Sequence, residues 1–455
     1  MSVQFAISGA SAEEIAGSVE RAVASGVLSP GTKLPSVRTL ADSLDVSPTT
    51  VASALAELRR RGVVVSRARS ATRVADRPPL RSPRAPSPLP PGTRDLALGN
   101  PDPAFLPDLA PALTALASGA STRGSGSAAA TQRGPFAQRL YGEAPVDGGL
   151  AELARAAFIA DGVAAERVVV VNGALDGIER VLAAQLAPGD LLAVEDPGWP
   201  GVLDLARALG LRLAPVTVDG RGMRPESLAA ALAAGARGAI VTPRGHNPLG
   251  AALDAERAGE LRELLRDVLV VEDDHLGPVA GVPYCSATGA GGRWAVVRSV
   301  SKWLGPDLRC AVLTADELTL ARVEGRLSLG PGWVSSILQR LAARLWADSE
   351  IAALVRRAAD VYSTRRAALV HALAAHGIAA EGRSGLNVWV PVPDEDAAVR
   401  ALLGHGVAVA AGAPFRLEAG PAVRVTIATL ELEEAAPLAA ALAAAVDPPR
   451  RTRAA

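Results

Sequence analysis

Hydrophobic residues follow two different patterns along the chain. Residues 11–27 carry them at helical spacing, and helix signals recur over 36–44 and 48–61. Beyond residue 95, short apolar runs that end in polar residues alternate with helical stretches. This change of pattern predicts a small helical unit followed by a larger α/β unit.

Five apolar runs in the larger unit have the length of buried strands. They are VVVV (168–171), LLAVE (191–195), AIVT (239–242), VLVVED (268–273) and WAVVRS (294–299). Continuous apolar runs separated by helices are typical of a parallel sheet that is covered on both faces. We therefore expect a mostly parallel α/β sheet with functional residues at the carboxyl ends of its strands.

The small unit has the turn and cap residues of a winged helix-turn-helix. Ser36 is a predicted N-cap, and Ser47 is another, with Pro48 in the first helical position. Asp45 stands between the two helices, where the turn needs a residue that tolerates the left-handed conformation. A two-stranded wing follows over 63–74. The second of these helices is then the one expected to enter the DNA major groove.

A proline-rich stretch separates the two units. Residues 77–91 contain seven prolines, which exclude a helix and favour an extended spacer. We predict a DNA-binding domain over residues 1–75, a linker over 76–94 and a large domain over 95–447.

Composition narrows the class of protein. The 455 residues are 49% hydrophobic and 21% charged, with a formal net charge of zero. Two cysteines, Cys285 and Cys310, are too few for a disulfide framework or a cysteine-rich zinc site, so we expect no metal. No segment has the length and apolarity of a membrane span, and the N-terminus lacks signal-peptide character. We expect a soluble cytoplasmic protein.

Basic charge is concentrated next to the helix-turn-helix. From Arg59 to Arg84 there are nine arginines and one acid, Asp76. In a neutral chain, such a cluster is a local footprint for DNA phosphates. The alternative is a solvated arginine-rich face without a partner.

The large unit contains one lysine where almost every other basic residue is arginine. The whole chain has two lysines, Lys33 and Lys302. An amine forms an imine with an aldehyde, whereas a guanidinium does not. Burial lowers the pKa of a lysine and makes its amine nucleophilic near neutral pH. Lys302 is therefore a candidate for covalent chemistry.

Residues at three other strand ends are candidate ligand contacts. Gly173 and Ala174 begin a helix, where backbone N–H groups attract anions, although many such turns bind nothing. Trp199 is either a core residue or an aromatic face for a planar ligand. Asn247 offers an amide to a ring oxygen.

The last two strand ends complete a cofactor pattern. Asp273 either belongs to a solvated acidic turn or holds a pyridine nitrogen in its protonated form. Ser299 and Arg309 flank Lys302 and can bind a phosphate. In this order, the candidate residues describe a site for pyridoxal 5'-phosphate.

The small unit resembles the DNA-binding domain of the GntR regulators through LPSVRTLADSLDVSPTTVASAL, residues 34–55. The resemblance implies a DNA operator as partner. It also implies DNA-contacting residues, which are Ser36, Arg38, Thr49, Thr50 and, in the wing, Arg67 and Arg69. Pro48 replaces an arginine that is usual in this family.

The large unit resembles the fold-type I aminotransferases, which have a mostly parallel sheet and a smaller C-terminal α+β subdomain. The motifs NGAL, DPGW, HNPLG, EDDH and SVSK carry the resemblance. It implies Lys302 as the Schiff-base lysine, Asp273 as the partner of the pyridine nitrogen and Asn247 as the contact of the ring hydroxyl. Trp199 would stack on the ring. The phosphate would lie on Gly173, Ala174, Ser299 and Arg309.

Three further roles follow from the same resemblance. Arg424 matches the arginine that binds a substrate carboxylate, and His275 stands where a tyrosine usually contacts the ring oxygen. Tyr141 matches a tyrosine that reaches the phosphate of a neighbouring subunit, which implies a homodimer. Leu249 replaces the usual threonine of the NPTG motif.

Together the two units resemble the MocR group of bacterial regulators. This implies a transcription regulator that senses pyridoxal phosphate, or an amine or amino acid effector, through an aldimine at Lys302. The alternative is an active aminotransferase with an accessory DNA-binding domain, because the residues needed for turnover are present.

Overall fold

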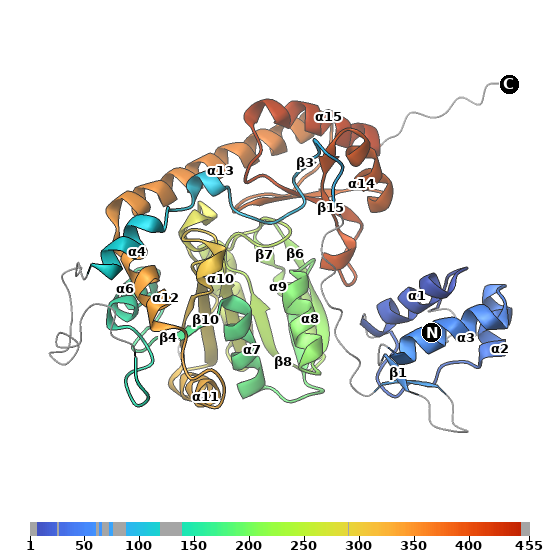
Figure 1. The fold of residues 1–455 in the computed structure, drawn as a ribbon, viewed down its shortest axis with the longest axis horizontal. Helices are drawn as coiled ribbons and strands as arrows, with labels where there is room; N and C mark the ends of the chain where they lie inside the picture. Colours follow the sequence, from blue (N-terminus) through green and yellow to red (C-terminus); the bar gives the residue numbers. More distant parts are fainter. Residues whose placement is uncertain are drawn as a thin grey trace. The chain divides into compact units, whose positions relative to one another are not determined.

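The computed structural model describes residues 7–24, 27–60, 63–65, 72–75, 88–118, 139–289 and 291–446. The chain divides into two compact units, Met1–Pro88 and Leu89–Ala455, which are drawn together in Figure 1. Most of the predicted linker, 76–87, lies outside the described residues. Arg94, its last residue, already pairs with the large unit, because its N–H donates to Gly406 O at 2.8 Å.

The small unit is a winged helix-turn-helix, as predicted. Its elements are α1 (Ala12–Ala24), α2 (Val37–Leu44), α3 (Pro48–Arg60), β1 (Val64–Val65) and β2 (Arg73–Val74). The helices enclose a core that includes Ile15, Leu40 and Leu58. The two strands pair antiparallel and form the base of the wing.

Local chemistry explains where the helices of this unit begin and end. Ser36 Oγ accepts the N–H of Thr39 at 3.1 Å, and Ser47 Oγ accepts that of Thr50 at 3.0 Å. Asp45 adopts the left-handed conformation, with φ of 53°, at the end of α2. The three predicted turn and cap residues are therefore confirmed.

The large unit is built on an eight-stranded sheet with the order β4-β11-β10-β9-β8-β5-β6-β7. The strands are β4 (Val169–Val171), β5 (Leu191–Asp196), β6 (Arg212–Asp219), β7 (Gly222–Met223), β8 (Ala236–Val241), β9 (Leu269–Asp274), β10 (Arg293–Ser299) and β11 (Ala311–Ala315). Of these, β7 and β11 run antiparallel to their neighbours. All five predicted strands are present, whereas β6, β7 and β11 were not predicted.

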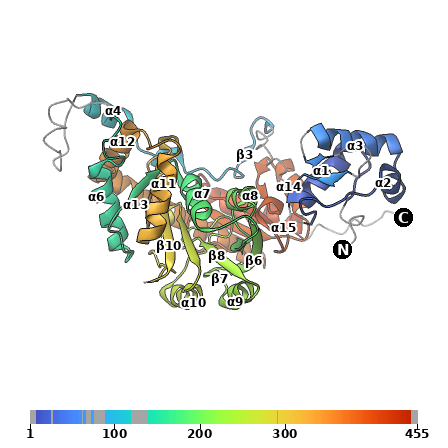
Figure 2. The same cartoon turned by 90° about the horizontal axis from the view of Figure 1, so that it is seen from below.

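Helices cover both faces of this sheet. One face carries α7 (Ala174–Gln185), α8 (Pro200–Ala208) and α11 (Glu317–Ser328), and the other carries α9 (Pro225–Ala233) and α10 (Ala255–Leu265), as Figure 2 shows. Successive strand residues point to opposite faces, so Val171 packs under α7 and Val170 belongs to the core on the other side. Burial on both faces explains why the strands are continuous apolar runs.

The rest of the large unit forms a smaller subdomain and the helices that join it to the sheet. Its antiparallel sheet contains β12 (Asn387–Pro391), β15 (Ala422–Thr426) and β14 (Ala410–Ala411). The helices are α4 (Ala110–Ala117), α6 (Gly148–Ala160), α12 (Ser336–Ala347), α13 (Ser349–Ala375), α14 (Glu395–Gly404) and α15 (Ala435–Val446). This arrangement matches the predicted C-terminal α+β subdomain. No described helix is long and apolar enough to cross a membrane.

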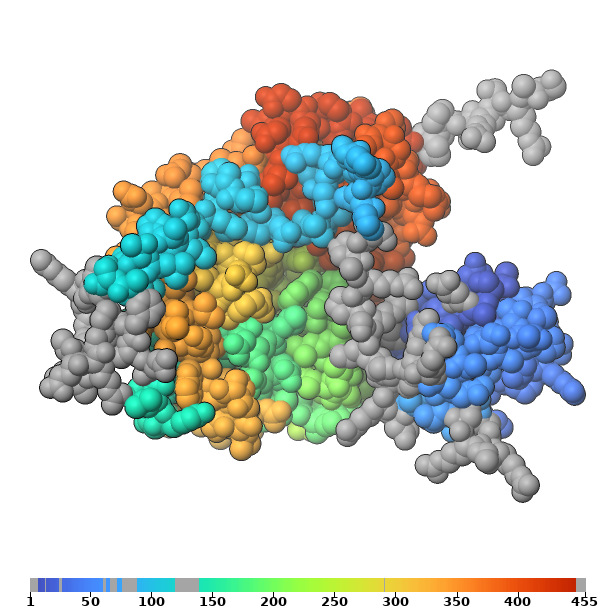
Figure 3. All heavy atoms as spheres, in the orientation of Figure 1, coloured from blue at the N-terminus to red at the C-terminus, as the bar shows by residue number. Residues whose placement is uncertain are grey.

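The segment after β3 (Arg94–Asp95) runs between this subdomain and the sheet (Figure 3). Its Leu96 O accepts the N–H of Thr426 at 2.9 Å, and its Asp102 pairs with Arg365 of α13 at 2.9 Å. Gly99 lies between these two contacts in the sequence. The contacts hold it beside Lys302, the predicted cofactor lysine.

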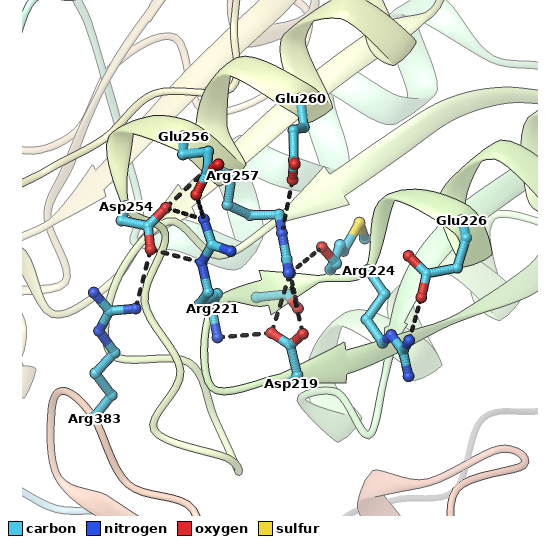
Figure 4. A network of polar contacts seen from close by, with 11 residues as sticks. Asp219, Arg221, Arg224, Glu226, Asp254, Glu256, Arg257, Glu260 and Arg383 are labelled. Atoms are coloured by element: carbon cyan, nitrogen blue, oxygen red, sulfur yellow. Dashed lines mark hydrogen bonds and ion pairs between the residues drawn. The ribbon is translucent and has the colours of Figure 1, made fainter.

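A network of ion pairs fixes the β6–β7 hairpin to the start of α10 (Figure 4). Arg221 binds both oxygens of Asp254, the N-cap of α10, at 2.7 and 2.8 Å. The buried Arg257 binds Asp219 at 3.1 Å. Arg383, which precedes β12, reaches Asp254 at 3.4 Å, so the network also ties the C-terminal subdomain to the sheet.

Candidate cofactor site and DNA-binding surface

Lys302 lies just after β10 with its amine turned into the large unit. Its Nζ donates to the backbone oxygen of Gly99 at 2.5 Å. Burial, together with the nearby positive charge of Arg424, lowers the pKa of Lys302 to about 8. About a tenth of this amine is therefore neutral and nucleophilic at pH 7, far more than for a lysine of ordinary pKa.

Asp273 is the second-to-last residue of β9 and is 2% exposed. Its Oδ1 atom has no hydrogen-bond partner in the described part of the chain. Burial raises the pKa of Asp273 to about 8, and the negative charges of Asp274 and Glu195 contribute. A buried carboxyl with an unsatisfied oxygen is costly unless a ligand supplies the missing partner.

Three other predicted residues share a cavity with Asp273. They are Trp199, Asn247 and His275. The Nδ1 atom of His275 lies 3.7 Å from Asp273 Oδ2 and has no hydrogen-bond partner among the described residues. Burial, and then the charge of Lys302, lowers the pKa of His275 to about 4, so this imidazole is neutral at pH 7.

The predicted phosphate residues gather at the start of α7. Gly173 is the N-cap of that helix and has φ of 92°, and Ala174 is its first residue. Arg309 Nη2 donates to Asn172 O at 3.2 Å, and a Cβ on Gly173 would lie only 2.8 Å from the same nitrogen. The glycine therefore lets a guanidinium approach the free N–H groups of a helix N-terminus, which favours an anion.

Ser299 lies at the end of β10 and is buried. Its hydroxyl donates to Ser301 Oγ at 3.0 Å and accepts the N–H of Ser301 at 3.1 Å. The hydroxyl therefore already has two partners, and its predicted role at the phosphate stays a prediction.

Arg424 of β15 extends from the C-terminal subdomain toward the same cavity. It donates to Asn247 Oδ1 at 3.1 Å and to the backbone oxygen of Ala97, and it lies 4.9 Å from the ring centre of Phe415. Burial lowers its pKa to about 10, so it remains a cation at pH 7. The structure thus brings Arg424, Asn247 and Lys302 together.

Tyr141 is not part of this group. Its side chain is 93% exposed and makes an edge contact with Trp333, with 5.5 Å between ring centres. Its predicted reach into a neighbouring subunit is not tested by a single chain and stays a prediction.

Four of the predicted DNA contacts, Ser36, Arg38, Thr49 and Thr50, lie in the described part of the small unit. Arg38 and Thr49 are exposed, whereas the hydroxyls of Ser36 and Thr50 also serve the helix starts. Arg67 and Arg69 lie outside the described residues.

Sequence reasoning missed two other basic residues. Lys33 and Arg73 are exposed and pair across an isolated bridge at the base of the wing. Arg73 belongs to the predicted arginine cluster, which is a signal that could have found it.

No cluster of three histidine, cysteine or acidic side chains suitable for a metal ion occurs among the described residues. Cys285 and Cys310 are both free thiols.

The residues present fit pyridoxal phosphate. The unsatisfied oxygen of Asp273 suits a protonated ring nitrogen, and the neutral His275 has an unsatisfied nitrogen near it. Gly173 and Arg309 offer the anion cradle, and Lys302 offers the amine. Bound pyridoxal phosphate supplies an aldehyde that condenses with amines and a ring that withdraws electrons.

Two family profiles match the chain. "Aminotransferase class I and II" matches residues 149–442, and "Bacterial regulatory proteins, gntR family" matches residues 11–74. The matches coincide with the large unit and with the winged helix-turn-helix.

Curated relatives include proteins that contain both parts. The "Vitamin B6 salvage pathway transcriptional repressor PtsJ" of Salmonella typhimurium is 38% identical over 443 residues, which cover 95% of this chain and 98% of that protein. The "HTH-type transcriptional regulator TauR" of Rhodobacter capsulatus is 29% identical and covers 87% of this chain and 88% of its own length.

Solved structures agree on the fold of the large unit. A kynurenine aminotransferase of Pyrococcus horikoshii aligns with a TM-score of 0.67 and 19% identity, covering 78% of this chain and 91% of that one. Pyridoxal phosphate is the cofactor that the family and the site both require. The chain therefore belongs to the MocR-type regulators of the GntR superfamily, transcriptional regulators that join a GntR DNA-binding domain to a pyridoxal-phosphate-binding domain of aminotransferase class I and II.

Proposed function

We propose that this regulator binds pyridoxal phosphate covalently through Lys302 and that pyridoxal phosphate itself is its signal. The observation that carries the proposal is the half-buried Lys302, one of two lysines in the chain, whose amine donates to Gly99 O and has a lowered pKa. PtsJ, a 38% identical relative, is named as a repressor of the vitamin B6 salvage pathway, which supports a B6 vitamer as the signal and repression as the output. Because its proposed target is DNA, we propose that the protein acts in the cytoplasm.

The test uses the full chain and DNA fragments selected by it from its source genome. A signal shifts DNA binding only by its difference in affinity for the two states of the protein. We expect added pyridoxal phosphate to change fragment affinity at least about tenfold in the wild type and not in Lys302→Ala. An equal response of both proteins, or no response, would contradict the proposal.

A second candidate is a response to an amino acid, with or without transamination. The buried Arg424 favours it, because its cation faces the cavity beside Asn247 and matches a carboxylate. Screening amino acids against the cofactor-loaded protein separates the two readings. A shift in absorbance that depends on Arg424 and alters DNA binding would support an amino acid signal, and steady release of a keto acid would support turnover.

The protein is also proposed to be a homodimer in which Tyr141 reaches the partner's cofactor phosphate. The nearly complete exposure of Tyr141 supports this, because it leaves the side chain accessible to a second copy of the chain. Sedimentation of the full chain tests the dimer. Weaker cofactor binding by Tyr141→Phe, with unchanged sedimentation, tests the role of the hydroxyl.

A further inference from the structure

A second buried carboxylate lines the same cavity as Asp273, and no role has been assigned to it so far. Glu195 lies near the end of β5 and is 6% exposed. It shares the cavity lining with Trp199, Asn247 and Asp273. Neutral residues would fill this place at a lower desolvation cost, so the charge needs an explanation.

Two donors of Thr242 hold Glu195, and no strong cation of the described residues pairs with it. Thr242 N–H donates to its Oε1 at 2.9 Å, and the Thr242 hydroxyl donates to its Oε2 at 2.6 Å. The Nε2 atom of His246 lies 3.4 Å from the same Oε2. Among the ion pairs of the described residues, Glu195 has no lysine or arginine partner.

His246 lies next to Glu195 and is fully buried. Its Nδ1 accepts the N–H of Leu249 at 3.2 Å. This Nδ1 therefore carries no proton, and the ring proton is assigned to Nε2, which faces Glu195. The Glu195 carboxylate thus has Thr242 as its hydrogen-bond partner and no paired lysine or arginine among the described residues.

That charge acts on Asp273. Besides burial, two negative groups raise the pKa of Asp273, namely Asp274 and Glu195. Asp274 is bound by Arg244 at 2.8 Å and Arg298 at 2.6 Å, which offset its charge. Glu195 has no such counter-charge.

The other titratable groups around Asp273 do not replace this effect. His275, after β9, is 3.7 Å away and neutral, because its pKa is lowered to about 4 by burial. The charge of Lys302, after β10, acts on His275. His246, after β8, faces Glu195, with its Nε2 atom 3.4 Å from Glu195 Oε2.

We propose that Glu195, held by Thr242, is a positioning residue that keeps one proton on the pair formed by Asp273 and the cofactor's ring nitrogen. In the protonated pair, the carboxylate and the pyridinium have no net charge, and in the deprotonated pair the net charge is −1. A fixed negative charge at Glu195 disfavours the second state. No proton enters or leaves the site below the pH at which the pair titrates.

The test follows the ring nitrogen directly. The full chain is loaded with pyridoxal phosphate labelled with ¹⁵N in the ring, and the nitrogen chemical shift is recorded against pH. We expect Glu195→Gln to lose the ring proton at a pH at least about one unit below that of the wild type. Glu195→Asp, which keeps the charge, should lie nearer to the wild type.

Glu272→Gln is the matched control. Glu272 is a buried carboxylate on β9, but it faces the opposite side of the sheet from Asp273, where Tyr284, Ser286 and Ala287 donate to it. Replacing Glu272 should leave unchanged the pH midpoint at which the ring nitrogen loses its proton. If Glu195→Gln does not fold, Thr242→Val removes a donor of the Glu195 anion and should lower the midpoint instead.

The proposal is overturned if folded Glu195→Gln, or Thr242→Val in its place, titrates with the wild-type midpoint. It is also overturned if the ring nitrogen of both proteins keeps its proton up to the pH at which the protein unfolds. Fluorescence-detected unfolding at each pH distinguishes loss of fold from loss of the proton.

Discussion

Asp273 and Asp274 are consecutive residues at the end of β9, yet the two sides of the sheet treat them differently. On one side, Asp274 accepts hydrogen bonds from Arg244 and Arg298. On the other side, Asp273 has an oxygen without a partner. Burial alone would raise both pKa values, but the two guanidiniums outweigh it and lower the pKa of Asp274, whereas the pKa of Asp273 rises to about 8.

This difference distinguishes a carboxylate that stabilises the fold from one that is available to a ligand. The side of Asp274 is complete, because Arg298 also binds Asp161 at 2.6 Å and lies 4.7 Å from the ring centre of Phe158. The side of Asp273 is complete only when a ligand brings a donor. A buried polar group that lacks a partner is a sign of a binding site, whereas a fully partnered one is a sign of a structural tie.

The largest expected effect comes from removing the carboxylate of Asp274, which the two arginines bind. Asp274→Asn leaves Asp161 as the one remaining carboxylate partner of the buried Arg244 and Arg298 among the described residues, and we expect a loss of about 3–5 kcal/mol in the free energy of unfolding. Urea unfolding of the cofactor-free chain measures it. A loss below about 1 kcal/mol would show that this side is not the structural tie described here.

Replacing Asp273 by asparagine should have the opposite effect and raise the free energy of unfolding of the cofactor-free chain. Because the folded pKa of Asp273 is raised above its usual value of 3.8, the folded state retains a proton that the unfolded state has lost, and stability falls as pH rises from about 4 to about 8. Asp273→Asn removes this penalty. We expect the cofactor-free variant to gain on the order of 2–4 kcal/mol over the wild type at pH 8, and little at pH 4.

Cofactor binding sharpens this second prediction. Asp273→Asn should weaken pyridoxal phosphate binding at least about tenfold, because the amide does not stabilise a pyridinium. Equilibrium titration followed by absorbance measures it. A variant that is less stable than the wild type at pH 8, or that binds the cofactor equally well, would remove the distinction between the two aspartates.

The smaller unit extends the comparison to an exposed residue. Arg38 of α2 is exposed and makes no side-chain hydrogen bond or ion pair within the described ranges, unlike the buried Arg244 and Arg298. We expect Arg38→Ala to weaken binding to the selected DNA fragments by about 1–3 kcal/mol without changing the unfolding curve. Arg21→Ala, at another exposed arginine on α1, is the control. Equal losses in both variants would indicate general charge attraction instead of a specific contact.

Much of the fold, and the positions of several candidate site residues, could be predicted from the sequence where the signal is local. The run at 268–273 predicted β9 and placed Asp273 at its end, and Ser36, Asp45 and Ser47 predicted the helix boundaries of the small unit. Lys302 became a candidate because it is a rare residue type in this chain and follows a predicted strand.

The rest depends on partners that are distant in sequence. Asp274 meets Arg244 and Arg298, which are 30 and 24 residues away, and Glu195 meets Thr242 after 47 residues. No spacing rule links such pairs, because the sheet order brings them together. The antiparallel β11 was missed for a similar reason, since its pairing with β10 and β4 is set by the whole sheet.

The central claim is that Lys302 holds the cofactor, and the composition of the chain makes its test unusually direct. The wild-type protein is loaded with pyridoxal phosphate, reduced with borohydride to fix any carbon–nitrogen double bond, digested and mapped by mass spectrometry. Because the chain has two lysines, the label has two possible side-chain positions. The account predicts the label on Lys302 and none on Lys33. A label on Lys33, or no fixed label, would contradict it.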